Sequence, residues 1–426
     1  MSLKQNRRSF LSKTALAGAG LLSAPALSWG QGLIDANERT SKASAPSDLK
    51  ITAVTCAFSG GSLFVKISSN QGIVGYGEGV DAVGGTYHLV KRLGMQITNQ
   101  SPLNPNRLIE QLRKGAFFGG AQSGVYIAVL SAIETALWDL TGKALGLPVY
   151  QLMGGKFRDK CRVYCDTALY TRNLPTPDDY AKAAAGSVAK GYTAIKFDID
   201  AGNDPNKYDR FNWTAGPAEL ERMYNAIAAA RKAVGSKIDI CVDLHGRYDA
   251  TTGHRVAKMM EPLNLMWLEE PVPADNVDAY KHITRETSTP ICTGENVYLA
   301  YGFTRLLSDG AVDIVMPDLQ KTGGLSEGQR IANLANLYYV PFSPHMVASF
   351  LGAMACAHCC VSVPNFQIME WQTYFDVDTK WKDMVIYDKP WVEKGFLTVS
   401  EKPGIGVDIN EEGLKKYATP GIPYFE

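Results

Sequence analysis

Six polar side chains stand at a regular spacing in the second half of this chain of 426 residues. They are Asp243, Glu269, Glu295, Asp318, His345 and Glu370, with steps of 26, 26, 23, 27 and 25 residues between them. Each lies at or just after the end of a short apolar run, and a step of about 25 residues suits one β-strand with its connecting helix. The carboxyl ends of the strands in a (β/α)8 barrel meet at one mouth. The spacing therefore predicts that all six side chains surround one cavity.

The first three of these side chains predict a metal site. Carboxylates that converge from consecutive strands repel one another unless a hard cation neutralises them, and ligands that are all oxygen favour Mg²⁺ over zinc or copper. We expect one Mg²⁺ per subunit, held by Asp243, Glu269 and Glu295. His345 has an acidic candidate partner one strand earlier, Asp318.

Two groups of elements must position these residues. Alternating apolar residues at 51–54, 63–67 and 73–76 predict an antiparallel meander, and apolar residues at helical spacing predict a helix from Gly124 to Leu145. Eight β-rich runs, each followed by a helical stretch, come after them at 161–166, 194–198, 238–243, 265–269, 291–295, 312–316, 340–343 and 366–370. The predicted fold is α/β, a (β/α)8 TIM-like barrel with an N-terminal α+β capping domain.

The first residues predict export. Arg7 and Arg8, an apolar run from Thr14 to Leu22 and Ala24-Pro25-Ala26 resemble a twin-arginine signal with its cleavage site, which implies a periplasmic protein. The expected parts are a signal at 1–26, a linker at 27–48, the capping domain at 49–160, the barrel at 161–385, and a C-terminal segment at 386–426 that returns to the capping domain.

The composition gives no sign of a nucleic-acid or membrane partner. The chain has 43 basic and 43 acidic residues, and cleavage after Ala26 would leave 39 basic residues and a net charge near −4. The eight cysteines are spread through apolar segments, as expected of buried thiols and not of a disulfide framework.

Several strings together carry a resemblance to a known family. They are Ala132-Ile133-Glu134-Thr135-Ala136-Leu137-Trp138-Asp139-Leu140, Leu268-Glu269-Glu270-Pro271, Thr293-Gly294-Glu295-Asn296, Met316-Pro317-Asp318 and Ser343-Pro344-His345. From about residue 49 onward the chain resembles the mandelate racemase branch of the enolase superfamily. The resemblance implies that Glu269 and not Glu270 is the ligand, that His345 takes the proton next to a substrate carboxylate, that Asp318 orients His345, and that Glu370 donates a proton to the enediolate oxygen.

Two further strings narrow the reaction. Asp243-Leu244-His245-Gly246-Arg247 resembles the acid-sugar dehydratases, which implies that His245 is the general acid for a departing hydroxyl. Ala194-Ile195-Lys196-Phe197-Asp198 matches the position where racemases of the family carry Lys-x-Lys, so Asp198 stands in place of the second lysine. Lys196 would polarise the substrate carboxylate; Asp198 is either a base or the partner of Lys196 in a local ion pair.

The function expected from these residues is Mg²⁺-dependent dehydration of a small-molecule sugar acid to a 2-keto-3-deoxy acid, by a lyase that forms homo-oligomers as its relatives often do. Candidate substrate contacts are Arg247, Phe58, Tyr87, His88 and Trp371, with Phe58 and His88 in glycine-rich loops of the capping domain. A racemase, epimerase or cycloisomerase is the main alternative. An exported carbohydrate-binding protein without catalysis is another, although it would not need a base opposite a metal.

Overall fold

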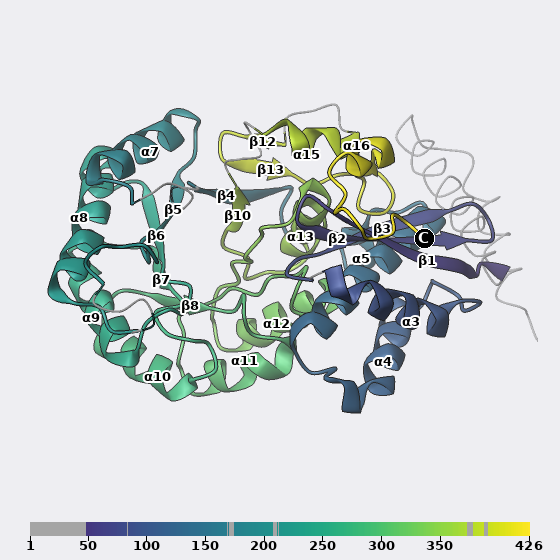
Figure 1. The fold of residues 1–426 in the computed structure, drawn as a ribbon, viewed down its shortest axis with the longest axis horizontal. Helices are drawn as coiled ribbons and strands as arrows, with labels where there is room; N and C mark the ends of the chain where they lie inside the picture. The colour runs from purple at the N-terminus through teal and green to yellow at the C-terminus, as the bar shows by residue number, and fades with distance from the viewer. Residues whose placement is uncertain are drawn as a thin grey trace, which may run out of the picture. The chain divides into compact units, whose positions relative to one another are not determined.

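The computed structural model describes residues 48–82, 84–167, 169, 174–207, 211, 213–372, 378–386 and 391–426. The export signal and nearly all of the linker expected from the sequence lie outside these residues. Residues Leu49–Glu426 form one compact unit, which holds both the capping domain and the barrel. Figure 1 shows the purple strands of the capping domain and the teal and green barrel elements.

The capping domain is a three-stranded antiparallel sheet with helices packed on it. Its strands are β1 (Ile51–Ser59), β2 (Ser62–Ser69) and β3 (Val74–Gly79), in the order β1-β2-β3. Its helices are α3 (Tyr87–Ile97), α4 (Pro105–Gly115), α5 (Gly124–Leu145) and α6 (Val149–Leu152), with 3-10 turns η2 (Gly84–Thr86) and η3 (Phe117–Gly119). A Cβ atom on Gly77 would stand 2.1 Å from the Ala132 carbonyl oxygen, so only glycine lets α5 lie this close to β3.

Helix α5 is long and apolar enough to span a membrane by length and composition. It is mostly buried inside the protein, so packing against the sheet and the barrel explains its apolar character. Its bounds are those predicted from the sequence.

Parallel strands close the barrel. They are β4 (Lys160–Asp166), β5 (Ala194–Asp198), β6 (Asp239–Asp243), β7 (Trp267–Glu269), β8 (Ile291–Thr293), β9 (Ile314–Val315) and β10 (Met369–Gln372). Neighbours pair in chain order from β4 to β9, and β10 pairs back to β4. The strand expected at 340–343 is present only as single bridges from Phe342 to Val315 and to Phe366. These bridges complete the eighth position, so the predicted barrel is present with one strand much shorter than expected.

Helices cover the outside of the barrel (Figure 1). They are α7 (Pro177–Ala189), α8 (Pro217–Val234), α9 (Ala250–Met260) with η5 (Glu261–Leu263), α10 (Val277–Glu286), α11 (Leu299–Ser308), α12 (Leu325–Leu337) and α13 (Phe350–Val361). Their apolar faces and the outward-facing strand residues form one large buried cluster. A second, smaller cluster lies inside the barrel and includes Tyr164 and Trp267.

Two buried glutamates of the capping domain cap helices of the barrel. The Glu78 carboxylate accepts hydrogen bonds from the backbone N–H groups of Ser349 and Gly352, at 2.8 and 3.1 Å, at the start of α13. The Glu134 carboxylate accepts from the N–H groups of Leu325 and Ser326, both at 2.8 Å, at the start of α12. Negative charge is favourable at a helix N-terminus, so these contacts tie the two domains together.

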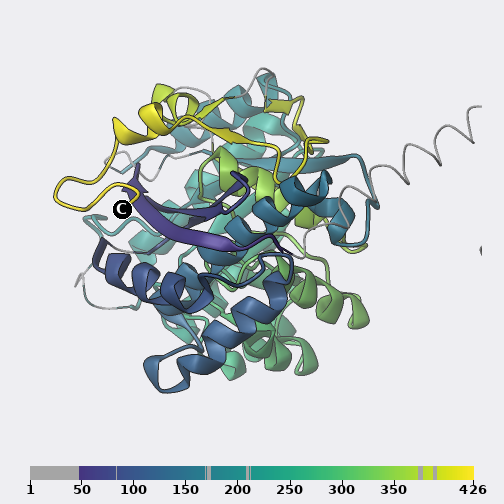
Figure 2. The same ribbon diagram turned by 90° about the vertical axis from the view of Figure 1, so that its right-hand side faces the viewer.

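The C-terminal segment contacts both domains. The elements that follow β10 are α15 (Thr379–Asp383), β11 (Val385–Ile386), β12 (Val392–Glu393), β13 (Phe396–Thr398), β14 (Asp408–Ile409) and α16 (Glu411–Lys415), and those from residue 386 onward belong to this segment. Strand β13 pairs antiparallel with the beginning of β4, so this part stays on the barrel. The last part contacts the capping domain, where the N–H groups of Thr419 and Phe425 donate to β1 (Figure 2).

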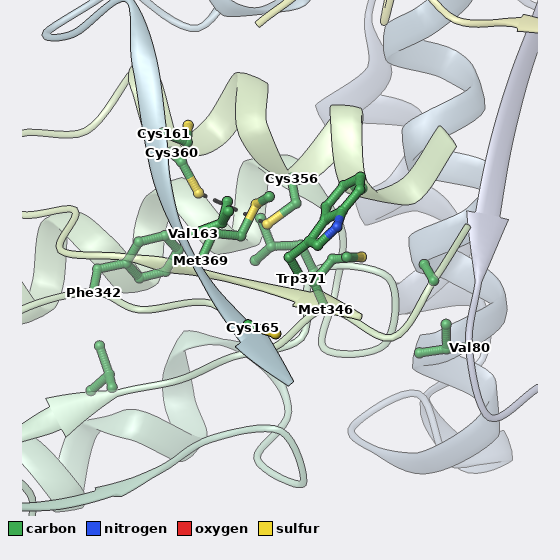
Figure 3. Close-up of a cluster of buried hydrophobic side chains, with 14 of the residues drawn as sticks. Val80, Cys161, Val163, Cys165, Phe342, Met346, Cys356, Cys360, Met369 and Trp371 are labelled. Carbon is green, nitrogen blue, oxygen red and sulfur yellow. Dashed lines mark hydrogen bonds between the residues drawn. The ribbon is translucent and has the colours of Figure 1, made fainter. Parts of the chain in front are cut away.

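All eight cysteines are free and buried, as expected. Cys356 and Cys360 lie on α13 with their sulfur atoms 3.9 Å apart, in the cluster of side chains drawn in Figure 3. Burial raises the pKa of the Cys359 thiol well above its usual value, and that of Cys360 likewise. These thiols stay protonated and act as apolar filling.

Candidate active site

The barrel strands bring the predicted residues to one end. Asp198, Asp243 and Glu269 are the last residues of β5, β6 and β7, and they are direct neighbours in the parallel register. Asp318 and His345 form a parallel bridge beyond the end of β9. Glu295 follows β8 by two residues, and Glu370 lies in β10. All six of the regularly spaced side chains are buried at the carboxyl ends of the strands.

Lys196 of β5 lies in the middle of the carboxylates. Its Nζ atom is 3.0 Å from Asp243 Oδ2, 3.4 Å from Glu269 Oε1 and 3.2 Å from Glu370 Oε1. Burial disfavours the ammonium, but the carboxylates of Glu269, Glu370 and Asp243 outweigh burial and raise the pKa of Lys196 well above its usual value. The lysine is therefore a fixed positive charge in a water-poor cavity.

His345 is held between acidic groups. Its Nδ1 atom is 2.8 Å from Asp318 Oδ2, and its Nε2 atom is 2.9 Å from Glu295 Oε2 and 3.5 Å from Glu370 Oε2. Burial lowers the pKa of His345, but Glu370, Glu295 and Asp318 raise it more, and the net pKa lies well above the usual value. The contact to Asp318 leaves Nε2 as the atom that faces the cavity, as a general base requires.

Glu370 is fixed in place by hydrogen bonds. It accepts from the Met346 backbone N–H at 2.8 Å and from Gln372 Nε2 at 3.1 Å. With Lys196 and His345 also in contact, its carboxyl group points into the cavity from the strand that closes the barrel. This position suits a group that contacts a substrate carboxylate.

His245 lies on the same rim, beyond the end of β6. Its Nε2 atom is 3.5 Å from Asp243 Oδ2, and its Nδ1 atom is 3.2 Å from Asp200 Oδ1. Its backbone has a φ of 47°, a left-handed conformation that is uncommon for histidine, and its N–H donates to Asp243 Oδ1 at 2.7 Å. Burial lowers the pKa of His245, but Asp243 and Asp200 outweigh it and raise the pKa to about 11. A protonated imidazole at the rim suits a general acid.

The carboxylates fit a divalent cation. Burial, with Asp243 as the next cause, raises the pKa of Glu269 well above its usual value, so the negative charges on neighbouring strands oppose one another. A Mg²⁺ ion bound by Asp243, Glu269 and Glu295 would relieve this repulsion, and all three offer the oxygen ligands that it prefers. In this structure Lys196 and His345 balance part of the charge. Among the described residues, the group whose ligand atoms all lie within 4.8 Å of one another is Asp198, Asp243 and His245, which shares only Asp243 with the predicted ligand set.

The expected substrate contacts have different outcomes. Arg247 lies on the rim, with its Nε atom 2.8 Å from Asp200 Oδ2 and its side chain 58% exposed. Tyr87 and His88 begin α3 and contact each other edge to face, and the Tyr87 hydroxyl lies 3.4 Å from the Glu426 carbonyl oxygen near the chain end. Phe58 is buried in the core of the capping domain and pairs with Leu63 across the hairpin. The expectation that Phe58 belongs to a mobile loop over the mouth is wrong.

The predicted role of Trp371 is also wrong. Side chains alternate along a strand, so Glu370 points into the barrel and Trp371 points outward. The indole is buried and stacks on Phe350 of α13, with ring centroids 5.8 Å apart. Figure 3 shows Trp371 beside Cys356 and Met346 in this cluster. The residue therefore neither contacts a sugar nor plugs the mouth.

A chain of polar side chains next to the predicted metal ligands was not expected from the sequence. Lys321 Nζ donates to Asp81 Oδ2 of the capping domain at 2.6 Å and to Asn296 Oδ1 at 2.9 Å. Asn296 Nδ2 donates to Glu295 Oε1 at 3.0 Å and to Glu270 Oε2 at 2.8 Å. Burial, followed by Glu295, raises the pKa of Glu270 to about 7. The signals were present, since Asn296 directly follows a ligand and Lys321 follows Asp318 by three residues.

Comparisons with known proteins agree with this geometry. Residues 179–413 match the "Enolase C-terminal domain-like" family, and residues 37–154 match the "Mandelate racemase / muconate lactonizing enzyme, N-terminal domain" family. The chain belongs to the mandelate racemase/muconate lactonizing enzyme family. This confirms the resemblance stated from the sequence motifs.

Relatives in the family include sugar-acid dehydratases. The chain is 35% identical to a D-xylonate dehydratase of Haloferax volcanii, over 89% of this chain and 91% of the relative. It is 31% identical to a D-galactonate dehydratase of Pectobacterium atrosepticum, over 82% of this chain and 89% of the relative. A mandelate racemase/muconate lactonizing enzyme-like protein of Rubrobacter xylanophilus superposes with a TM-score of 0.84 at 39% identity, over 89% of this chain and all of that chain. The predicted fold and enzyme class are confirmed by these relatives.

Proposed function

We propose that this protein is a Mg²⁺-dependent dehydratase that converts a sugar acid to a 2-keto-3-deoxy sugar acid. The observation that carries the proposal is the pair of histidines on opposite sides of one carboxylate and lysine cluster. His345 Nε2 is 2.9 Å from Glu295, and His245 Nε2 is 3.5 Å from Asp243. Elimination of water needs one group that removes a proton and another that gives one to the leaving hydroxyl.

The first step is removal of the C2 proton by His345 Nε2. Asp318 holds the opposite ring nitrogen and stabilises the imidazolium that forms. When bound, Mg²⁺ would offset most of the negative charge of Asp243, Glu269 and Glu295 and act as a Lewis acid that makes the C2 proton more acidic. Lys196 and Glu370 lie 3.2 Å apart and would contact the substrate carboxylate, where negative charge develops.

The second step is departure of the 3-hydroxyl group. His245 gives its Nε2 proton to the leaving oxygen, the C3–O bond breaks, and the electron pair at C2 forms the C2–C3 double bond. Water leaves, and the resulting enol rearranges to the keto acid. Arg247, on the exposed rim, is placed to contact the distal hydroxyl groups of the sugar.

Asp198 argues against a racemase that uses a lysine as its second base. Burial, followed by the nearby Asp166 carboxylate, raises the pKa of Asp198 well above its usual value. An aspartate stands where such a racemase needs a lysine. An epimerase or cycloisomerase shares the first step with a dehydratase, and only the product separates them.

A substrate screen tests the proposal. The protein with Mg²⁺ is incubated with a library of sugar acids, and 2-keto acid formation is followed with semicarbazide. We expect one or a few sugar acids to react, activity to be lost with a chelator and restored by Mg²⁺, and His345→Asn to abolish it. Products of the same mass as the substrate would instead show an epimerase or cycloisomerase. If His245→Asn turned over the substrate at the wild-type rate, His245 would not be the general acid.

Location and assembly are two further proposals, and both rest on the sequence alone. We propose export by the twin-arginine pathway, which carries folded proteins and would allow the barrel to load its metal first. Replacing Arg7 and Arg8 by lysine should then leave the protein in the cytoplasm on cell fractionation. We also propose a homo-oligomer, whose mass light scattering would measure directly.

A further inference from the structure

Asp200 is a buried carboxylate at the rim of the mouth to which the steps above assign no role. It lies two residues after the end of β5, and its two oxygens have different partners. Oδ1 is 3.2 Å from His245 Nδ1, and Oδ2 is 2.8 Å from Arg247 Nε. One carboxylate therefore links the proposed general acid to a cation on the rim.

The arrangement repeats that of the proposed base. Asp318 follows β9 and contacts Nδ1 of His345, which follows the short strand position at Phe342. Asp200 follows β5 and contacts Nδ1 of His245, which lies beyond β6. In both pairs the Nε2 atom faces the carboxylate cluster, at 2.9 Å from Glu295 and 3.5 Å from Asp243.

We propose that Asp200 is a positioning residue for the general acid, an inference that rests on the proposed dehydratase function. By accepting the Nδ1–H of His245, Asp200 fixes the ring so that Nε2 carries the proton delivered to the leaving hydroxyl. After delivery, His245 remains as the Nδ1–H tautomer, in which that hydrogen bond is kept. Arg247 forms an ion pair with the second oxygen of Asp200, at 2.8 Å.

The backbone at His245 makes this support necessary. The left-handed φ of 47° is held by hydrogen bonds of its own N–H to Asp243 and of the Gly246 N–H to the Glu270 carbonyl oxygen at 2.8 Å. These contacts fix the main chain and not the imidazole, whose ring atoms contact Asp243 and Asp200. The His245 side chain is 34% exposed, so packing alone does not select one ring orientation, and the Asp200 contact supplies it.

The test separates the two halves of the reaction. Asp200→Asn removes the negative charge that faces Arg247, and the amide NH₂ group then faces either His245 Nδ1–H or the Arg247 guanidinium, so one of the two contacts is lost. We expect elimination to slow by about 100-fold, the usual scale of general acid catalysis. Exchange of the C2 hydrogen in deuterium oxide, which needs His345 but not His245, should stay within a few-fold of the wild-type enzyme.

Asp204→Asn is the matched control in the same loop. Asp204 is buried and pairs with Arg222 away from His245, so its loss should lower the melting temperature without changing the ratio of exchange to elimination. The inference is overturned if Asp200→Asn retains elimination, or if it loses exchange and elimination together as a merely structural variant would.

A measurement on the unaltered enzyme covers the case in which Asp200→Asn does not fold. Nitrogen NMR of protein labelled at its six histidines reports which ring nitrogen carries a proton, and the His245 signal is identified as the one missing in His245→Asn. We expect a protonated, hydrogen-bonded Nδ1; an unprotonated Nδ1 would overturn the inference. If the wild-type enzyme dehydrates no sugar acid, the proposed function is wrong. The NMR result on the protonation of His245 Nδ1 would still be interpretable.

Discussion

Asp318→Asn should nearly abolish turnover without unfolding the protein. Asp318 Oδ1 accepts from the Gln320 backbone N–H at 2.8 Å, and Oδ2 accepts from His345 Nδ1 at 2.8 Å. An asparagine has one acceptor oxygen for these two donors. If the backbone N–H keeps that oxygen, the amide NH₂ faces His345 Nδ1, which must then be unprotonated. The ring proton moves to Nε2, where it blocks the atom that should remove the substrate proton.

The expected loss in kcat is about 10³- to 10⁴-fold, the scale seen when an aspartate of a catalytic histidine is replaced by asparagine. This corresponds to about 4 to 5.5 kcal/mol in activation free energy. The assay is steady-state 2-keto acid formation with the sugar acid found by screening, together with C2 hydrogen exchange, and both rates should fall in parallel. Exchange must fall because His345 performs it.

Asp313→Asn is the control for this prediction. Asp313 lies just before β9, at the opposite end of the same strand, and accepts from the Ile291 backbone N–H at 2.9 Å. Asp313→Asn also removes one carboxylate, but this carboxylate contacts no histidine in the described structure. We therefore expect kcat to change by less than about twofold. An Asp318→Asn enzyme within tenfold of the wild-type rate would refute the assignment of Asp318 as the residue that orients the base.

Three further predictions concern stability. Trp371→Leu should reduce the free energy of unfolding by about 2 to 4 kcal/mol through loss of buried volume, with KM unchanged. Glu134→Gln should cost about 3 kcal/mol in denaturant unfolding, because one of two helix N–H donors loses its acceptor and the charge is removed. Burial of His358 lowers its pKa from 6.5 to about 4, so as the pH falls the unfolded chain binds a proton before the folded protein does. The free energy of unfolding should therefore fall by about 3 kcal/mol between pH 6.5 and pH 4.

Each of these predictions has an outcome that contradicts it. A raised KM with unchanged stability in Trp371→Leu would return the indole to the substrate site. Glu110→Gln, at a partly exposed pair with Arg113, is the control for Glu134 and should cost less than about 1 kcal/mol. In His358→Gln the slope of stability against pH between 4 and 6.5 should flatten; an unchanged slope would assign the acid sensitivity to other groups.

The sequence predicted the positions of the residues that lie at the ends of the barrel strands. Asp243 and Glu269 follow apolar runs that can only be buried strands, and parallel strands in a closed barrel leave no other place for their last side chains. The same reasoning found His345 although its own strand is reduced to single bridges, because the spacing of the units is kept. Periodicity therefore predicted the fold and the ring of functional groups.

Two kinds of feature were beyond that reasoning. Contacts of loop residues such as Asp200 and Lys321 depend on how loops fold over the mouth, which no periodic pattern specifies. The direction of Trp371 was within reach, because a strand that points Glu370 inward must point the next side chain outward. The error came from giving weight to the residue type, an aromatic near a sugar site, ahead of the alternation of the strand.

The helix caps supplied by Glu78 and Glu134 limit how this scaffold can be taken apart. If the small domain were removed, the first turns of α12 and α13 would present bare N–H groups at a newly exposed apolar surface. A chimaera that borrows the sheet and α5 of another protein to change its substrate must therefore bring acidic groups to the same two places. Recombination of the two domains is restricted by these carboxylates at least as much as by the fit of the apolar surfaces.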